Sequence, residues 1–299
     1  MTGIDRQRAR AAFSAYVEPY DAARPRIALK VKHTYSVARI GERIAREEGL
    51  PAADVDLAWL CCLLHDIGRF EQLRRWDTFR DADSASHPAI GLAVLFGGKD
   101  MGPAVAQAAP ERAGAPAVSH PGAAREPGSG RIESFLEDRS HDALIRAAVG
   151  LHSDLRLPGT LDARARLFCD IVRDADKVDI FRASGYENSP ETVMGATREE
   201  FLGSWVSEPA RRAFLEHRCL ARDERETPLD QHLGTVALAY ELVLPASRRI
   251  AREQGFIYRD LETPFGIAEP FRRAETRAAW AELSAHLRTW LDGPAGDGK

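Results

Sequence analysis

The stretch LAWLCCLLHDIGR, residues 57–69, decides the fold of this chain. Residues 57–64 are apolar on nearly every side, which is typical of a helix buried in the core. His65 and Asp66 follow directly, and two ionisable side chains are costly to bury unless something pairs with them. A metal ion is the simplest partner for both side chains, and a hydrogen-bonded pair at a helix end is the alternative. We predict that Gly68 then ends the helix in a left-handed cap.

The two segments before this stretch are also predicted to be helical. Residues 3–24 are amphipathic, and residues 26–48 have one apolar stripe at steps of three and four, as one face of a helix requires. Gly49 and Pro51 end the second of these helices. The stripe consists of Leu29, His33, Val37, Ile40 and Ile44, so His33 is expected to face the core.

A loop and a short helix are predicted after the central stretch. Residues 69–86 are polar and show no clear period, so we expect a structured loop. Ser84 or Ser86 can then cap a helix over about 87–96, which places His87 at or beside the start of that helix.

Two further helices are predicted to present ligand-type side chains to the core. Ser140 is a suitable N-cap for a helix over 141–152, and His152 falls on its apolar stripe. On the next helix, over about 163–183, the residues at steps of four are Phe168, Val172, Asp176 and Ile180. Asp176 is therefore the carboxylate that belongs to the apolar face.

No strand pattern stands out, so the predicted fold class is all-α. Residues 1–183 are expected to form the core domain, with a flexible insertion at about 101–130 that is rich in Ala, Pro and Gly. Residues 184–291 are expected to form a helical extension packing on this core, and residues 292–299 a disordered tail. The helices of the extension are predicted over about 198–220, 228–254 and 267–291.

The composition is that of a soluble globular protein, with 44% hydrophobic and 29% charged residues. The net charge of −4 argues against general nucleic-acid binding, which requires a basic surface. No stretch is long and apolar enough to span a membrane, and the N-terminus lacks the apolar core of a signal peptide. The four cysteines form no CxxC pair and are interpreted as reduced residues of a cytoplasmic protein. The sequence does not indicate an oligomeric state.

Histidine and carboxylate side chains recur on the buried faces and ends of the predicted helices. A single histidine on an apolar face is more often a hydrogen-bonded core residue than a ligand. Several together favour one shared metal centre, because each buried polar group must find a partner. Imidazole and carboxylate ligands suit Mn²⁺, Fe²⁺, Zn²⁺ or Mg²⁺, and the absence of thiolates argues against a structural zinc site. The candidate ligands are His33, His65, Asp66, His87, His152 and Asp176.

The order of His33, the His65-Asp66 pair and Asp176 within RDADKVD, on an all-α chain, resembles the HD-domain superfamily of metal-dependent phosphohydrolases. The resemblance covers about residues 28–183 and is interrupted by the insertion. It implies an HD-domain helical bundle in which these four side chains hold a metal ion.

His87 and His152 fall where the binuclear branch of this superfamily has two further histidines. The resemblance therefore implies two divalent ions, with Asp66 bridging them. The chain lacks the GYP-type motif of cyclic-dinucleotide phosphodiesterases and the acidic pair that follows HD in (p)ppGpp hydrolases.

The activity that the resemblance implies is hydrolysis of a small phosphorylated substrate, a phosphomonoester or a phosphodiester such as a nucleotide, by a metal-activated water. Asp66 would act as the bridge. Arg69 and Lys177 are candidates for holding phosphate, and surface salt bridges are the alternative role for both. Glu71 and Gln72 are candidates for hydrogen bonds to the ligands.

Two other functions are compatible with the same residues. The ligand order also resembles the di-iron oxygenase branch of the superfamily, typified by myo-inositol oxygenase. A non-catalytic HD module for ligand binding is the third reading, although a module without catalysis has less need for so many buried polar groups.

Overall fold

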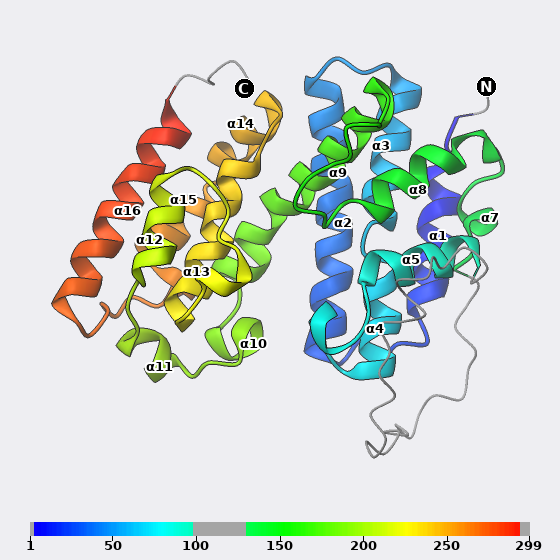
Figure 1. Cartoon of the computed structure of the whole chain (residues 1–299). Helices are drawn as coiled ribbons and strands as arrows, with labels where there is room; N and C mark the ends of the chain where they lie inside the picture. The colour runs from blue at the N-terminus through cyan, green and yellow to red at the C-terminus, as the bar shows by residue number, and fades with distance from the viewer. Residues whose placement is uncertain (1–2, 98–129, 294–299) are drawn as a thin grey trace. The chain divides into compact units, whose positions relative to one another are not determined.

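The computed structural model describes residues 3–97 and 130–293. Within these ranges every regular element is a helix and none is a strand, which confirms the predicted all-α class (Figure 1). None of the helices in the same ranges is both long and apolar enough to cross a membrane. The predicted flexible insertion, apart from Gly130, and the predicted tail after Gly293 lie outside the described residues.

The chain divides into two compact units, Met1–Arg173 and Asp174–Lys299. The division falls within helix α9 (Ala163–Ile180), shortly before the domain boundary predicted at residue 183. Each unit is described separately below.

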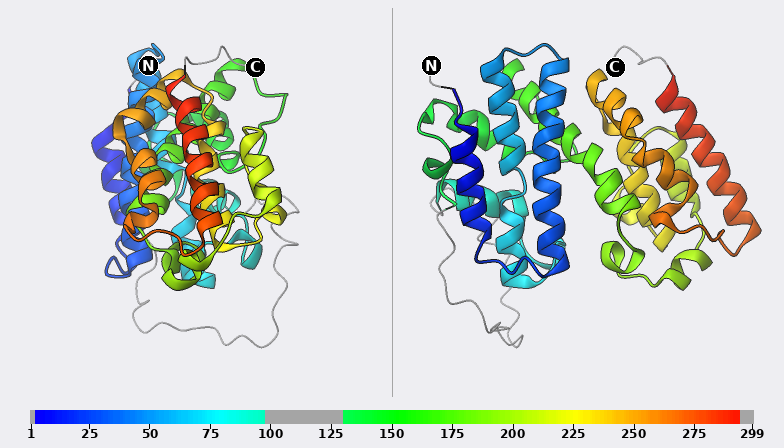
Figure 2. Two further views of the ribbon diagram at one scale, coloured as in Figure 1. Left: turned by 90° about the vertical axis from the view of Figure 1, so that its left-hand side faces the viewer. Right: turned by 180° about the vertical axis from the view of Figure 1, so that it is seen from behind.

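The first unit is built around helices α2 and α3, which pack along each other, with α1 beside α3 (Figure 2). Helix α4 packs against α5, and α5 packs against α8. The elements are α1 (Arg6–Val17), α2 (Pro25–Glu47), α3 (Ala52–Leu64), α4 (Gly68–Trp76), η1 (Asp81–Asp83), α5 (His87–Phe96), α7 (Ile132–Phe135), η3 (Arg139–His141) and α8 (Asp142–Gly150).

Helix α3 is the centre of this unit, as its sequence predicts. Every residue from Leu57 to Leu64 is buried, and Trp59 is among the largest fully buried side chains. Because a buried CH₂ group contributes about 0.8 kcal/mol, this helix accounts for much of the apolar stabilisation of the unit. The helix ends at Leu64, so His65 is its C-cap and Asp66 lies in the turn that follows.

Gly68 begins a helix instead of ending one, which corrects the prediction of a left-handed cap. Helix α4 starts at Gly68, whose φ is not positive. Its small size serves close packing: a Cβ atom on Gly68 would lie 2.2 Å from the His87 carbonyl oxygen and 2.5 Å from the Gly91 nitrogen. Gly68 therefore lets α4 touch α5. The loop predicted over 69–86 is accordingly wrong for residues up to Trp76.

The helix predicted over 87–96 is confirmed, and its N-cap is Ser86, whose hydroxyl accepts from the Ala89 N–H at 3.5 Å. The prediction for the next helix needs correction at both ends. Asp138, not Ser140, is the capping side chain, since it accepts from the Ser140 N–H at 2.9 Å. Helix α8 also stops at Gly150, so His152 lies in the turn beyond it.

Other predicted helices are shorter than expected. Helix α1 stops at Val17, although Tyr20 beyond it is still buried. In the second unit the predicted helix 198–220 breaks before Ser207, which caps a new helix, and the predicted helix 228–254 breaks before Pro245. Proline is favoured in a first helical turn because its missing N–H would be unpaired there anyway.

The second unit is a set of short helices beside one long terminal helix, α16 (Figure 1). Its elements are the end of α9, the π-helical segment η4 (Phe181–Tyr186), α10 (Pro190–Met194), α11 (Arg198–Gly203), α12 (Glu208–Leu215), η5 (Arg222–Glu224), α13 (Pro228–Val236), η6 (Ala237–Glu241), α14 (Pro245–Gln254), α15 (Phe256–Glu262), η7 (Pro264–Gly266) and α16 (Ala274–Asp292).

Candidate metal centre

Five of the predicted ligands lie together in the first unit, and each is at most 5% exposed. His33 comes from the middle of α2, and His65 and Asp66 from the end of α3 and the turn after it. His87 is the first residue of α5, and His152 follows α8. The close contact between α4 and α5 at Gly68 is what brings His87 to the end of α3.

Asp66 lies between two pairs of histidines. Its Oδ2 atom is 3.7 Å from His33 Nε2 and 3.6 Å from His65 Nε2. Its Oδ1 atom is 3.5 Å from His87 Nε2 and 3.7 Å from His152 Nε2. In each of these two groups the potential ligand atoms lie within 4.8 Å of one another. Each of the two groups therefore offers three ligand atoms from which a metal site could be built.

Hydrogen bonds fix the tautomer and the orientation of three of the histidine rings. The Nδ1 atoms of His65 and His152 lie 2.7 Å from the backbone oxygens of Cys62 and Val149. A carbonyl oxygen only accepts, so each Nδ1 must be the donor, and in the neutral ring Nε2 then has a free lone pair. The Nδ1 atom of His87 donates in the same way to the Asp81 carboxylate at 2.7 Å.

The close approach of His87 and His152 is better explained by a cation bound between them than by a core without a metal ion. Their Nε2 atoms are 3.0 Å apart. With both Nδ1 atoms donating, the two Nε2 lone pairs of the neutral rings face each other, which is unfavourable without a positive charge between them. The donor set of imidazoles and a carboxylate suits Mn²⁺, Fe²⁺ or Zn²⁺. The residues present therefore fit a divalent metal centre.

Two cationic side chains also contact Asp66. Lys30 Nζ lies 2.6 Å from Asp66 Oδ2, and Arg69 Nε lies 3.5 Å from Oδ1. Burial by itself raises the pKa of the Asp66 carboxyl, but the positive charge of Lys30, together with that of Arg69, holds that pKa well below its ordinary value. Burial lowers the pKa of His87 to about 4, so its ring is neutral near pH 7.

Asp81 supports His87 from the side away from Asp66. Besides His87, its carboxylate accepts from Gln72 Nε2 at 2.8 Å and from Arg69 Nη1 at 3.2 Å. Burial raises the pKa of Asp81, yet the hydrogen bond and charge of His87, with Arg69, lower it to about 2. A carboxylate behind a ligating imidazole fixes its tautomer and orientation.

Asp81→Asn is expected to weaken metal binding roughly 10- to 100-fold, because His87 loses the acceptor that orients its ring. Dissociation constants for Mn²⁺ from calorimetry would measure this effect. Asp83→Asn is the matched control, since Asp83 is an exposed carboxylate of the same short turn whose ion-pair partner among the described residues is Arg80, at 3.3 Å. Equal affinities of Asp81→Asn and the unmodified protein would contradict the supporting role of Asp81.

Of the residues predicted to support the ligands, Gln72 lies near the histidine–aspartate cluster and Glu71 does not. Gln72 reaches the ligands through Asp81, whereas Glu71 accepts from the Tyr20 hydroxyl at 3.2 Å and from the Arg75 guanidinium at 2.6 Å, away from the cluster. Arg69 also donates to the Phe79 carbonyl at 2.6 Å.

Asp176 and Lys177 belong to the second unit, so their roles at the metal and at phosphate stay predictions. The neighbouring aspartates have structural partners within that unit. Asp174 accepts from the Leu244 N–H at 2.9 Å, and Asp179 pairs with Arg182 at 2.7 Å.

Lys30 and Asp81 are the important residues that sequence reasoning missed. Lys30 lies one helical turn before His33 on α2, so the i, i+3 spacing on one helix face was a usable signal. Asp81 gave no comparable signal, because it is one of several acidic residues in a polar segment.

The fold and this cluster define an all-α protein with a buried histidine–aspartate centre of the kind that holds divalent metal ions. Residues 31–95 match the family model described as HD domain, and this segment includes His33, His65, Asp66 and His87. This match supports membership of the HD-domain superfamily, as the motif order predicted. Neither the curated proteins nor the solved structures include a significant match to the chain.

Proposed function

We propose that this chain is a metal-dependent phosphohydrolase acting on a small phosphomonoester or phosphodiester. The proposed ligands of two divalent ions are His33, His65, Asp66, His87, His152 and Asp176. HD-domain membership and the clustering of the first five support this proposal. Divalent ions bound there would lower the pKa of a water molecule and stabilise negative charge on phosphate oxygens.

The observation that most favours a phosphorylated substrate is the pair of cations beside the cluster. Lys30 and Arg69 both contact Asp66, and their side chains are 17% and 16% exposed, while that of Asp66 is 4% exposed. Both also lie over the Phe79 ring, at 5.3 and 5.6 Å from its centroid. They are thus held beside the ligands while still reaching solvent. A guanidinium fork and an ammonium point charge are the groups that hold phosphate oxygens.

The side chains of the site would have two kinds of role, metal binding and substrate binding. The histidines and Asp66 would hold the ions, and the hydrogen bonds from Nδ1 would keep the Nε2 atoms of His65, His87 and His152 aimed inward. Arg69 orients the phosphoryl group, and Lys30 balances charge that develops on it. An uncharged hydrophobic substrate would make no use of either positive charge.

Lys30→Gln is expected to lower kcat/KM for a phosphoester roughly tenfold to a hundredfold, because one charged contact to the phosphoryl group is lost. The metal content should stay unchanged, since Lys30 is not a ligand. Lys32→Gln, two residues along the same helix, is the matched control and should retain full activity. A Lys30→Gln protein with unchanged kcat/KM would argue against a substrate role for this side chain.

The activity test compares p-nitrophenyl phosphate and bis(p-nitrophenyl) phosphate with Mn²⁺, in air and without oxygen. We expect hydrolysis of at least one of them that depends on metal and not on oxygen. Bound iron together with an oxygen-dependent reaction would favour the di-iron oxygenase alternative instead. A metal-loaded protein that is inactive toward a broad panel of phosphoesters and diols would favour a non-catalytic HD module.

A further inference from the structure

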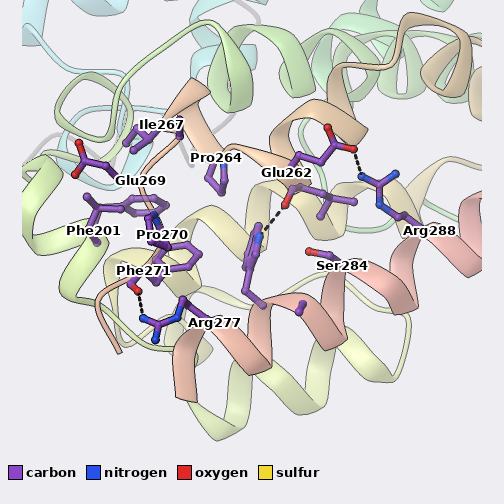
Figure 3. A pocket seen from close by; sticks show the side chains of 15 residues that line it. Phe201, Glu262, Pro264, Ile267, Glu269, Pro270, Phe271, Arg277, Ser284 and Arg288 are labelled. Atoms are coloured by element: carbon purple, nitrogen blue, oxygen red, sulfur yellow. Dashed lines mark hydrogen bonds and ion pairs between the residues drawn. The ribbon is translucent and has the colours of Figure 1, made fainter. Parts of the chain in front are cut away.

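Residues of the second unit form a cavity of about 360 Å³ (Figure 3). Helix α16 forms one wall, and the segment between α15 and α16 forms the rim. The volume lies at the lower end of the range for small-molecule sites. Its apolar lining includes Phe201, Pro264, Ile267, Phe271 and Trp280.

The cavity walls are held in place before any ligand binds. Trp280 Nε1 donates to the Leu261 carbonyl at 2.9 Å, so the indole has a fixed orientation. The Arg272 N–H donates to the Leu202 carbonyl at 2.9 Å, which ties the rim to α11. The rim also contains Phe265, a buried non-glycine residue with φ of 55°. Preformed walls reduce the entropy that a ligand must lose on binding.

One cationic side chain in the lining of this cavity is available to a ligand. Arg277 is exposed, and its Nη1 donates to the carbonyls of Phe271 and Arg272 at 2.6 and 3.0 Å, with no carboxylate partner among the described residues. By contrast, Arg288 is neutralised by Glu262 at 2.8 Å. The Ser284 hydroxyl oxygen has no accessible surface, so it offers no contact to a ligand.

Arg277 and the apolar wall beside it define the shape of a ligand. Trp280 lies three residues after Arg277 on the same helix, about 4.5 Å along its axis, and forms an apolar surface together with Ala281. A ligand that matches both features has an anionic end and a flat apolar body.

We propose that the second unit binds a small amphipathic carboxylate in this cavity, with the carboxylate at Arg277 and an aromatic body against Trp280. This proposal does not rest on the proposed phosphohydrolase activity. It gives the second unit a ligand-binding role of its own.

The test is calorimetric titration of the full chain with 4-phenylbutyrate, which has a carboxylate and an aromatic ring joined by a short chain. We expect saturable binding at one site per chain with a Kd of about a millimolar or tighter, given its small number of atoms. The amide of the same compound, which lacks the charge, should bind roughly tenfold more weakly. Arg277→Gln should weaken binding of the carboxylate by a similar factor and hardly affect the amide.

Two further variants separate ligand contacts from folding. Ala281→Leu fills the cavity without removing a polar group, and because Ala281 is exposed the helix should tolerate it. It should abolish binding of both compounds. Arg273→Gln is the matched control, an exposed arginine that precedes the same helix and does not line the cavity. Absence of saturable binding to the unmodified protein, or unchanged binding in Ala281→Leu, would overturn the proposal.

Discussion

Asp66→Asn is expected to lower metal-dependent phosphoester hydrolysis by about a thousandfold or more, and to remove the bound metal. The physical reason is the position of this carboxylate. Each of its oxygens faces a separate histidine pair, at 3.5–3.7 Å. Asparagine keeps the shape but offers one oxygen without charge, so at most one half of the cluster keeps an oxygen ligand.

The measurement is kcat/KM with p-nitrophenyl esters, combined with circular dichroism to confirm that the variant is folded. Lys30 loses its 2.6 Å partner in Asp66→Asn, so the double variant Lys30→Gln, Asp66→Asn is included to exclude an effect of an uncompensated buried charge. Asp83→Asn is the neutral control. If folded Asp66→Asn retained more than a tenth of the activity, the bridging role of Asp66 would be wrong.

Gly68→Ala is expected to destabilise the first unit by about 3 kcal/mol or more, which is at the upper end for overpacking. The added methyl group would lie 2.2 Å from the His87 carbonyl oxygen and 2.5 Å from the Gly91 nitrogen. Both atoms are backbone and cannot move aside as a flexible side chain can. The two helices must therefore separate, which also draws His87 away from Asp66. The free energy of unfolding from urea titration, with metal affinity in parallel, measures both effects.

Gly159→Ala is the matched control for this substitution, since a Cβ atom there meets nothing within 4 Å and φ is not positive. We expect a change within about 0.5 kcal/mol, as for most surface substitutions. Similar stabilities of the two variants would mean that α4 and α5 do not pack as closely as described.

The sequence predicts those parts of the site that follow from a local pattern. The apolar run 57–64 identifies a buried helix, and the stripe through His33 places that histidine in the core; both are confirmed. Ser86 as an N-cap fixes the start of α5 and thus the position of His87. These features depend on residues within a few positions of each other, so periodicity and capping rules suffice.

The features that sequence reasoning missed depend on contacts between distant segments. Gly68 looks like a helix end, and only the neighbouring α5 shows that it is a packing contact. Helix α4 is short and its buried Phe70 and Leu73 give too few repeats to show a period. The contact between Asp81 and His87 depends on a turn whose path the local pattern does not determine.

The central claim is that the histidine–aspartate cluster holds divalent metal ions. Elemental analysis per chain tests it most directly, on protein purified without added metal or chelator and again after soaking in Mn²⁺. The account predicts about two ions per chain in the unmodified protein and close to none in Asp66→Asn. An absence of metal from the unmodified, folded protein even after soaking would contradict it, and would leave a histidine-rich core held by hydrogen bonds alone.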